Sequence, residues 1–280
     1  MERLGERKKL NTDLGNKIFA VVNPVSANGK TGKNWPEIER FLQKNEIDFI
    51  STQTEYPEHS VSLVRDAIES GYKYIMSVGG DGTVNEVVNG FFKNERLINP
   101  EAKLIIFSRG TGSDFIKSLG INNTKKEIIK IIKNGQEKLV DIAKVNYINN
   151  EGYKAERYFV NISDAGIGGE TVGSVNNSSK FFGGIITYLF GALKTLALYN
   201  NKNFKMTVDG KNIVDRKINS IMVANGSYFA GGMKIAPEAD VNNGLLNLVV
   251  LGDLNKIEII KNLYKAYKGS HLSHPKIESY

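Results

Sequence analysis

The most constraining stretch of this sequence is a glycine-rich corner between an apolar run and a helical pattern. The apolar run Tyr74–Val78 leads directly into Gly79–Thr83, which reads Gly-Gly-Asp-Gly-Thr, and helical spacing follows from Val84 to Phe92. Glycines lack the Cβ atoms that would keep a ligand away from the backbone. The start of a helix presents N–H groups and the positive end of its dipole. The stretch therefore predicts a strand, a tight turn and a helix that together bind a phosphate group.

An acidic residue lies inside this corner, where a bare phosphate would repel it. Asp81 makes chemical sense there if a divalent cation, a water or a ribose lies between the carboxylate and the phosphate. The alternative is a structural turn with a solvated aspartate. We favour the functional interpretation, because three glycines, an acid and a threonine share one strand-to-helix corner.

The same order of apolar run, polar loop and helical pattern occurs twice more in the first half of the chain. The run Ile18–Val22 leads into Asn23–Lys33, and Leu104–Phe107 leads into Ser108–Asp114. The first loop is not a Walker phosphate loop, because its glycines, lysines and hydroxyls do not open a helix at the required spacing. The other helical and strand-like stretches of this half are Trp35–Gln43, Asp48–Thr52, Val61–Glu69, Phe115–Leu119 and Lys125–Lys133.

Strands that alternate with helices predict a parallel, doubly wound sheet. Ligands of such sheets bind beyond the carboxyl ends of the strands. The three corners fall on that edge, so together they predict one anion site more specifically than any single corner does. Asp114, at the start of a predicted helix, is expected to act first as a cap or dipole partner and only second as a ligand.

The pattern changes after Gly135, where helical stretches become scarce. The strand-like runs are Leu139–Val145, Tyr158–Ile162, Phe204–Val208, Ile218–Val223 and Leu245–Leu251, before a helical pattern from Lys256 to Tyr267. Turn-forming residues at 149–152 and 208–211 favour hairpins. We therefore predict an α/β domain over residues 1–138 and a mainly antiparallel β domain over residues 139–280.

Composition narrows the functional classes. The 280 residues carry a net charge of +7 and no cysteine, which excludes disulfides and thiolate metal sites. Because the basic residues are dispersed, an anionic membrane surface or anionic substrates are favoured over nucleic acid, which we expect not to bind. The apolar stretch Phe181–Tyr199 contains Lys194 and three glycines, so we expect an amphipathic helix there and no transmembrane segment. We expect the dispersed histidines, His59, His271 and His274, at the surface.

Six motifs in fixed order give the chain a resemblance to a known family. They are Asn23–Gly29, Gly79–Gly90, Gly110–Phe115, Val223–Gly226, Gly231–Pro237 and Asn243–Leu246. In these motifs the chain resembles the diacylglycerol kinase catalytic family, specifically its bacterial soluble lipid kinases, and more distantly the sphingosine kinases. The Gly-Gly-Asp core alone is shared with NAD kinases and phosphofructokinases. The resemblance covers nearly the whole chain from Lys17 onward.

This resemblance implies a fold, a reaction and a set of site residues. The fold is an α/β nucleotide domain and a β-sandwich lipid domain with the active site in a cleft between them. The reaction is transfer of the γ-phosphoryl group of ATP, with Mg²⁺, to a lipid hydroxyl such as that of diacylglycerol, which gives phosphatidic acid. The residues implied to contact ATP are Asn23, Pro24, Val25, Ser26, Ala27, Thr54, Gly80, Asp81, Gly82, Thr83, Val84, Asn85, Glu86 and Thr111. Asp81 would support catalysis through the magnesium network, and a second magnesium site would comprise Asp240, Asn243 and Leu245.

The sequence departs from the family pattern in two places. Asn243 stands where the family has an aspartate, so the second site lacks the charge that gives magnesium most of its affinity. The family's proton-accepting Asp-Gly-Glu turn is absent, since Asp209-Gly210 is followed by Lys211. The closing strands of the β domain are also expected to be missing. Either the sequence is truncated, or the protein ends short and is a poor catalyst whose open sheet edge a second subunit could pair in a homodimer.

Three functions therefore compete at this point. The leading hypothesis is a cytoplasmic lipid kinase, peripheral to the membrane, that takes its lipid substrate from a membrane surface. The second is a catalytically impaired homologue that binds nucleotide or lipid. The third is a soluble kinase such as an NAD kinase, which the motifs of the second half disfavour.

Overall fold

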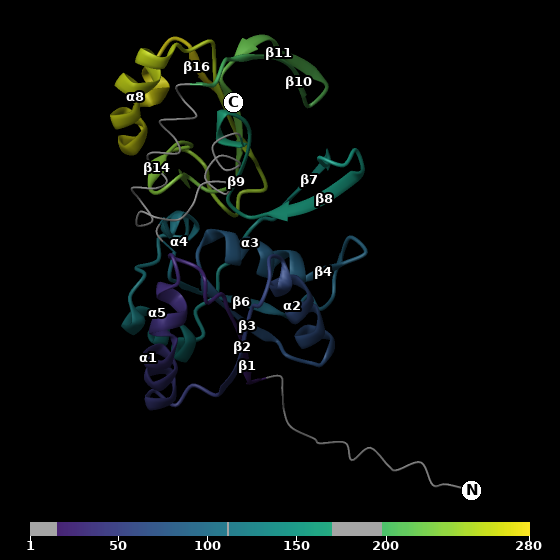
Figure 1. Cartoon of the computed structure of the whole chain (residues 1–280), viewed down its shortest axis with the longest axis vertical. Helices are drawn as coiled ribbons and strands as arrows, with labels where there is room; N and C mark the ends of the chain where they lie inside the picture. The colour runs from purple at the N-terminus through teal and green to yellow at the C-terminus, as the bar shows by residue number, and fades with distance from the viewer. Residues whose placement is uncertain (1–15, 111, 170–197) are drawn as a thin grey trace, which may run out of the picture.

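The computed structural model describes residues 16–110, 112–169 and 198–280. Figure 1 shows an α/β unit built from the first half of the chain and a β-rich unit built from the second. The predicted fold class is confirmed: a doubly wound α/β domain precedes a mainly antiparallel β-sandwich domain. The division near residue 138 stays a prediction.

The first unit is organised around a four-stranded parallel sheet in the order β2-β1-β3-β6. Its elements are β1 (Ile18–Val22), α1 (Lys30–Lys44), β2 (Phe49–Gln53), α2 (His59–Glu69), β3 (Tyr74–Gly79), α3 (Asp81–Gly90), the hairpin β4 (Phe92–Lys93) and β5 (Arg96–Leu97), β6 (Lys103–Ser108), α4 (Asp114–Ser118) and α5 (Lys125–Asn134). Because β2 and β3 lie on opposite sides of β1, the chain winds in both directions from the centre of the sheet.

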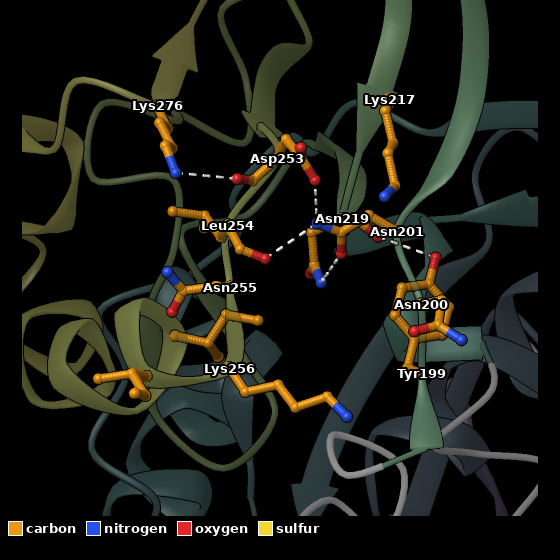
Figure 2. A pocket seen from close by; sticks show the side chains of 12 residues that line it. Tyr199, Asn200, Asn201, Lys217, Asn219, Asp253, Leu254, Asn255, Lys256 and Lys276 are labelled. Carbon is orange, nitrogen blue, oxygen red and sulfur yellow. Dashed lines mark hydrogen bonds between the residues drawn. The ribbon is translucent and has the colours of Figure 1, made fainter.

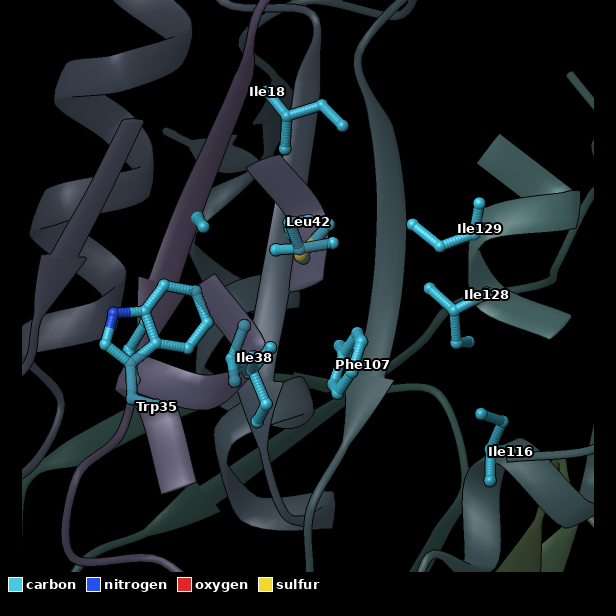
Figure 3. Close-up of a cluster of buried hydrophobic side chains, with 12 residues drawn as sticks. Ile18, Trp35, Ile38, Leu42, Phe107, Ile116, Ile128 and Ile129 are labelled. Atoms are coloured by element: carbon cyan, nitrogen blue, oxygen red, sulfur yellow. The ribbon is translucent and has the colours of Figure 1, made fainter. Parts of the chain in front are cut away.

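Alternation along β1 shows why both faces of this sheet are covered. Ile18, Ala20 and Val22 belong to a core with residues of α1 and α5, and Figure 3 shows that cluster around Phe107. Phe19 and Val21 point to the other face and pack with residues of α2 and α3. Successive side chains of a strand alternate between faces, so an uninterrupted apolar strand requires helices on both sides.

The second unit is antiparallel in every described pairing. Its elements are β7 (Ala143–Ile148), β8 (Lys154–Phe159), β9 (Ile162–Gly166), β10 (Lys202–Val208), β11 (Lys211–Ile218), β12 (Ser220–Ala224), β13 (Tyr228–Phe229), β14 (Met233–Lys234), β15 (Asn247–Leu251), α8 (Lys256–Lys268), the 3-10 turn His271–Ser273 and β16 (Ile277–Ser279). One sheet has the order β16-β15-β12-β9, and the remaining strands form the hairpins β7–β8, β10–β11 and β13–β14.

The structure corrects several sequence-based expectations. The run 158–162 is divided, because β8 ends at Phe159 and β9 begins at Ile162. His271 is buried, with 1% of its surface exposed, and its Nε2 lies 3.0 Å from the carbonyl oxygen of Ile235. The expectation of a surface position was therefore wrong for this histidine. The predicted helix at 181–199 falls almost wholly outside the described residues.

The two units are joined by a shared apolar cluster and by hydrogen bonds. Val84 and Val88 of α3 pack with Phe115, Val160 and Val241, all of them buried. The side chain of Asn89 in α3 also makes two hydrogen bonds to the backbone of Tyr158. Its Nδ2 donates to Tyr158 O at 2.9 Å, and its Oδ1 accepts from Tyr158 N–H at 2.9 Å. The α/β unit therefore holds the first strands of the second unit directly against the helix that follows the glycine corner. Within residues 16–110, 112–169 and 198–280, no helix has the length and apolar composition required to cross a membrane.

Candidate functional site

Four loops meet at the carboxyl edge of the parallel sheet. They follow β1 at Asn23, β2 at Thr54, β3 at Gly80 and β6 at Arg109. Backbone hydrogen bonds tie the starts of these loops to the sheet. Thr54 N–H donates to the carbonyl oxygen of Val22 in β1 at 2.8 Å. Asn23 N–H and Arg109 N–H donate to the carbonyl oxygens of Val78 and Gly79 in β3, at 2.9 Å and 2.6 Å. The loops after β1 and β3 flank the point where the winding direction reverses, which is where ligands of such sheets bind.

The loop after β1 is tied to the glycine corner and carries unusual backbone angles. Asn23 Nδ2 donates to Thr83 Oγ1 at 3.0 Å, which links the loop to α3. Ala27 and Asn28 have φ values of 51° and 56°, in the left-handed region that residues other than glycine seldom adopt. Such strain is concentrated at functional sites, where the surrounding structure compensates for it.

Helices α1 and α3 both begin at this edge without a side-chain cap. Their N-cap residues are Gly29 and Gly80, which have no side chain to offer to the N–H groups of the first turn. At α1 the loop itself satisfies the first N–H groups, since Thr31 N–H donates to Ser26 O at 3.4 Å and Gly32 N–H to Pro24 O at 3.1 Å. The start of α3, whose N-cap glycine offers no side chain, therefore has the stronger anion-binding character, because uncapped N–H groups and the positive end of the helix dipole attract anions.

The glycines of the corners serve two different purposes. A Cβ on Gly79 would lie 2.3 Å from Thr83 Oγ1, and one on Gly110 would lie 2.5 Å from Gly80 Cα. These glycines permit close packing between protein segments. A Cβ on Gly82 would meet nothing within 4 Å. The sequence-based argument assigned all the glycines of the corner to ligand approach, but in the structure Gly82 is the one that borders open space.

Asp81 is held in a fixed position and is not a solvated turn residue. Its Oδ1 accepts from Phe115 N–H at 3.0 Å and its Oδ2 from Asp114 N–H at 3.2 Å, so it caps helix α4 from across the site. Asp114 is not the N-cap of α4, which is Ser113, but it lies in the first turn of that helix, where the expectation of a dipole partner places it. Its side chain also reaches the second unit, where its Oδ2 accepts from Gly231 N–H at 2.7 Å.

The environment of Asp114 perturbs the pKa of its carboxyl group. Burial raises the pKa of its carboxyl, and the nearby charge of Asp81 raises it further, against a lowering by the hydrogen bond from Gly231 and by Lys117. The side chain of Asp114 is 7% exposed, and Lys117 Nζ lies 3.4 Å from its Oδ1. Buried carboxylates of this kind gather at functional sites.

The carboxylates of Asp81 and Asp114 lie close to each other beside Gly112. A Cβ on Gly112 would lie 3.0 Å from Asp114 Oδ2 and 3.4 Å from Asp81 Oδ2, so a larger residue here would crowd both oxygens. Magnesium is typically bound by one or two protein carboxylates together with substrate phosphates. No group of three or more His, Cys, Asp or Glu side chains suited to a metal occurs among residues 16–110, 112–169 and 198–280. The pair therefore fits magnesium that arrives with a phosphate ligand.

Some predicted ATP contacts are made less accessible by their packing. Val84 is 2% exposed and belongs to the cluster between the two units, so only its backbone could face a ligand. Asn85 turns its amide to the second unit; with the amide oxygen and nitrogen exchanged, it donates to Tyr158 O at 3.1 Å and accepts from Arg157 Nε at 3.2 Å. Thr111 lies outside the described residues.

The predicted second magnesium loop is stabilised by its own hydrogen bonds. Asn243 Oδ1 accepts from Leu245 N–H at 3.0 Å, and Asp240 Oδ1 accepts from the N–H of residue 242 at 3.4 Å. Asp141, which the sequence gave no reason to select, accepts from Gly244 N–H at 2.7 Å through its Oδ2. The loop thus keeps its shape through protein groups, and each oxygen retains a lone pair for a cation.

A hollow of about 660 Å³ lies elsewhere, in the second unit. Figure 2 shows it between Lys217 and Asn219, the turn at Asp253 and the start of α8 at Lys256. Asn219 is 1% exposed and donates through its Nδ2 to the side chain of residue 201 at 3.0 Å. None of the predicted ATP or magnesium contacts lines this hollow.

The fold and the site define a class of protein: an α/β and β-sandwich protein with a glycine-rich corner and a carboxylate pair where its two parts meet. Family models match both halves. The diacylglycerol kinase catalytic domain matches residues 17–145, and the YegS C-terminal NAD kinase beta sandwich-like domain matches residues 162–280.

Relatives and solved structures agree with these matches. The diacylglycerol kinase of Staphylococcus carnosus (strain TM300) is 24% identical over 257 residues, which are 92% of this chain and 79% of the relative. That of Bacillus subtilis (strain 168) is 27% identical over 263 residues, 90% of this chain and 79% of the relative. The crystal structure of a diacylglycerol kinase from Bacillus anthracis str. Sterne has a TM-score of 0.64 at 24% identity and covers 95% of this chain and 83% of its own. The chain belongs to the diacylglycerol kinase catalytic-domain family and is therefore a member of a kinase family, which confirms the resemblance found in the sequence.

Proposed function

We propose that this protein is an ATP- and magnesium-dependent lipid kinase whose acceptor is diacylglycerol and whose product is phosphatidic acid. Membership of a kinase family supports phosphoryl transfer. The name diacylglycerol kinase, carried by relatives that align with about nine-tenths of this chain, supports the acceptor.

The single observation that carries the proposal is the meeting of the start of α3 with a pair of carboxylates. The N-cap of α3 is Gly80, which leaves the first N–H groups of the helix without a side-chain cap, while Asp81 and Asp114 lie close together beside Gly112. Phosphoryl transfer depends mainly on positioning and charge neutralisation. This arrangement supplies both without a covalent intermediate.

The residues take the following roles in this proposal. Asn23–Ala27, Thr54, Gly80–Glu86 and Thr111 contact ATP, with Val84 and Asn85 contributing backbone groups. Asp81 and Asp114 hold magnesium, which neutralises the charge of the phosphates when it is bound. A second, weaker cation is held by Asp240, Asn243 and Leu245, beside the carboxylate of Asp141.

In the proposed reaction one bond to the γ-phosphorus forms and one breaks. The oxygen of the lipid hydroxyl forms a bond to the γ-phosphorus, the bond from that phosphorus to the β–γ bridging oxygen breaks, and ADP leaves with that oxygen. The hydroxyl proton passes to a base.

Asn243, an uncharged residue at the proposed second cation site, favours a second candidate function, a homologue that binds nucleotide or lipid with little turnover. One assay separates the two. The purified protein is incubated with labelled ATP, magnesium and diacylglycerol in mixed micelles, and labelled phosphatidic acid is measured, with NAD as a second acceptor in a parallel reaction. Labelled phosphatidic acid supports the lipid kinase. Thermal stabilisation by ATP without any labelled lipid supports the binder, and labelled NADP would replace both with the NAD kinase hypothesis.

A further inference from the structure

Helix α8 turns large apolar side chains toward solvent. Ile257, Ile260, Tyr264 and Tyr267 are 64%, 55%, 67% and 49% exposed. Their spacing of three, four and three residues places them along one side of the helix. We call these four residues the outer stripe.

The fold does not need the outer stripe for its own packing. Helix α8 is held through a narrow inner face, where Ile259 and Ala266 pack with residues of β12, β14 and β15. Its start is fixed by a capping box between Asn255 and Glu258, and its end by Gly269 in the left-handed conformation. Exposed apolar groups that contribute nothing to a core usually mark a contact surface.

Lysines follow the outer stripe along the exposed side of the helix. Lys261, Lys265 and Lys268 are all exposed, and Lys268 Nζ lies 4.5 Å from the ring centre of Tyr264. The acidic residue of α8, Glu258, is engaged by Lys276 Nζ at 2.9 Å. The exposed side thus combines apolar side chains with positive charge, which is the pattern of a helix that lies in the boundary of an anionic membrane.

The position of α8 connects this surface to the phosphate site. The helix contacts β14, and a Cβ on Gly269 would lie 3.1 Å from Pro237 and 3.3 Å from Lys234. The β13–β14 hairpin also carries Gly231, whose N–H donates to Asp114. Figure 1 shows α8, β14 and α4 along the same side of the molecule.

We propose that the outer stripe of α8 is the surface with which this protein docks on an anionic lipid membrane. The isoleucines and tyrosines enter the boundary between headgroups and acyl chains, while the lysines contact lipid phosphates. The proposal rests on the proposed function, since it names the surface from which a lipid kinase takes its substrate. A second copy of this chain is a poorer occupant, because it would bring another set of lysines to the same face, and each chain carries a charge of +7.

The test is a vesicle sedimentation assay with the full chain. Wild type is expected to bind vesicles of phosphatidylcholine and phosphatidylglycerol and to bind pure phosphatidylcholine much more weakly. The variant Ile257→Ser/Ile260→Ser/Tyr264→Ser is expected to bind the anionic vesicles about tenfold more weakly or worse. Lys261→Gln/Lys265→Gln/Lys268→Gln is expected to lose binding by a similar factor at low salt and by less at high salt.

A matched control comes from the β7–β8 hairpin. Ile148 and Tyr153 are 62% and 68% exposed, so Ile148→Ser/Tyr153→Ser removes comparable apolar surface from another place. This control is expected to bind vesicles as wild type does. Far-UV circular dichroism melts establish that all variants are folded, which is expected because every substituted side chain is exposed.

Activity measurements keep this inference separate from the proposed function. With a short-chain diacylglycerol that is monomeric in water, the outer-stripe variant is expected to phosphorylate as fast as wild type, and the loss is confined to vesicle substrate. If wild type binds anionic vesicles but phosphorylates no lipid, the proposed function fails and the docking surface stands. Equal vesicle binding by the outer-stripe variant and wild type overturns the docking surface, as does a change from dimer to monomer in light scattering with no change in vesicle binding.

Discussion

Gly82 is the residue whose substitution should most cleanly separate ligand binding from folding. A Cβ at this position has open space around it, so Gly82→Ala is expected to fold normally. It should gain about 0.5–1 kcal/mol from the better helix former. The added methyl group would stand in front of the α3 N–H groups, so the Kd for ATP is expected to rise about tenfold or more, which is about 1.4 kcal/mol. Urea unfolding and calorimetric titration with ATP measure the two effects.

Gly79→Ala is the matched control for that substitution. Its Cβ would lie 2.3 Å from Thr83 Oγ1, so overpacking is expected to reduce stability by about 1–3 kcal/mol. If Gly82→Ala proves as destabilising as Gly79→Ala, or leaves ATP affinity unchanged, the space at Gly82 is not where phosphates bind.

Asp114 is expected to reduce stability at neutral pH in return for its role in the site. Because burial raises its pKa above the ordinary value of 3.8, the folded state holds its proton more tightly than the unfolded state does. Stability therefore falls as pH rises from about 3.8 through the raised folded pKa, and stays lower above it. Asp114→Asn removes this decline, so the variant should gain stability relative to wild type between acidic and neutral pH.

The same variant should be a poor kinase. It removes one of the two carboxylates beside Gly112, so half-maximal activity is expected to need about tenfold more magnesium or worse. Melting temperatures measured from pH 3 to 7 and a magnesium titration of activity check both parts. A stability difference between variant and wild type that is the same at every pH would contradict the loss of stability attributed to the raised pKa of Asp114.

At this scale the sequence predicted local structure better than contacts between distant residues. It placed Asp81 and the glycines at the turn from β3 to α3, because local spacing determines a strand-to-helix corner. It could not show that Asp81 caps α4 or that Asp114 reaches Gly231, since both contacts join segments far apart in the chain. Asp141 was missed for the same reason: its partner, Gly244, is 103 positions away.

Among the elements, the loop at Asp240–Leu245 offers a direct test of the metal proposal. Asn243→Asp keeps the oxygen that accepts from Leu245 N–H and adds the negative charge that magnesium prefers. Magnesium affinity at this loop is expected to rise on the order of tenfold, so added magnesium should raise the melting temperature of the variant more than that of wild type.

Asn242→Asp is the control for this loop. It adds the same charge one residue away, at an exposed position outside the predicted ligand set. Thermal melts with and without magnesium compare the two variants. If magnesium raises the melting temperatures of both variants equally, it responds only to the added negative charge in the loop. That result would contradict the predicted set of metal ligands.

Elements were predicted well where periodicity was strong and less well at their boundaries. The apolar strands β1 and β3 were found within one residue, since buried parallel strands read as continuous apolar runs. Helix α1 begins at Lys30, five residues before its predicted start, because the polar residues before Trp35 carry no apolar periodicity. The hairpins followed from turn residues at 149–152 and 208–211.

At the scale of the whole molecule, the sequence predicted two units but not how firmly they are joined. The apolar cluster around Val84, Val160 and Val241 draws its members from both halves of the chain. From the sequence alone, each of these valines fits the core of one unit as well as it fits the interface between the two units. Only the tertiary arrangement shows that α3, which carries the phosphate-binding corner at its start, packs against the second unit along its length.

This joining predicts that the two units unfold together. Trp35 is the single tryptophan of the chain and is 4% exposed beside the parallel sheet, so its fluorescence reports the first unit, whereas far-UV circular dichroism reports both. Urea transitions followed by the two probes are expected to coincide, as they do for cooperative two-state unfolding.

Removing the hydrogen bonds between the units should separate these transitions. Asn89 exchanges two bonds with Tyr158, and Ser118 Oγ accepts from Ser227 N–H at 3.1 Å and from Tyr228 N–H at 3.3 Å. At about 0.5–1.5 kcal/mol per bond, Asn89→Ala/Ser118→Ala should remove about 2–6 kcal/mol of coupling.

The matched control, Asn45→Ala/Ser62→Ala, deletes the same side-chain types where they bond within the first unit, to Phe41 and His59. It should shift both transitions without separating them. Coincident transitions in the Asn89/Ser118 variant would mean that the apolar cluster alone couples the units. Separate transitions in wild type would mean that the phosphate corner and the second unit are not held together as the site requires.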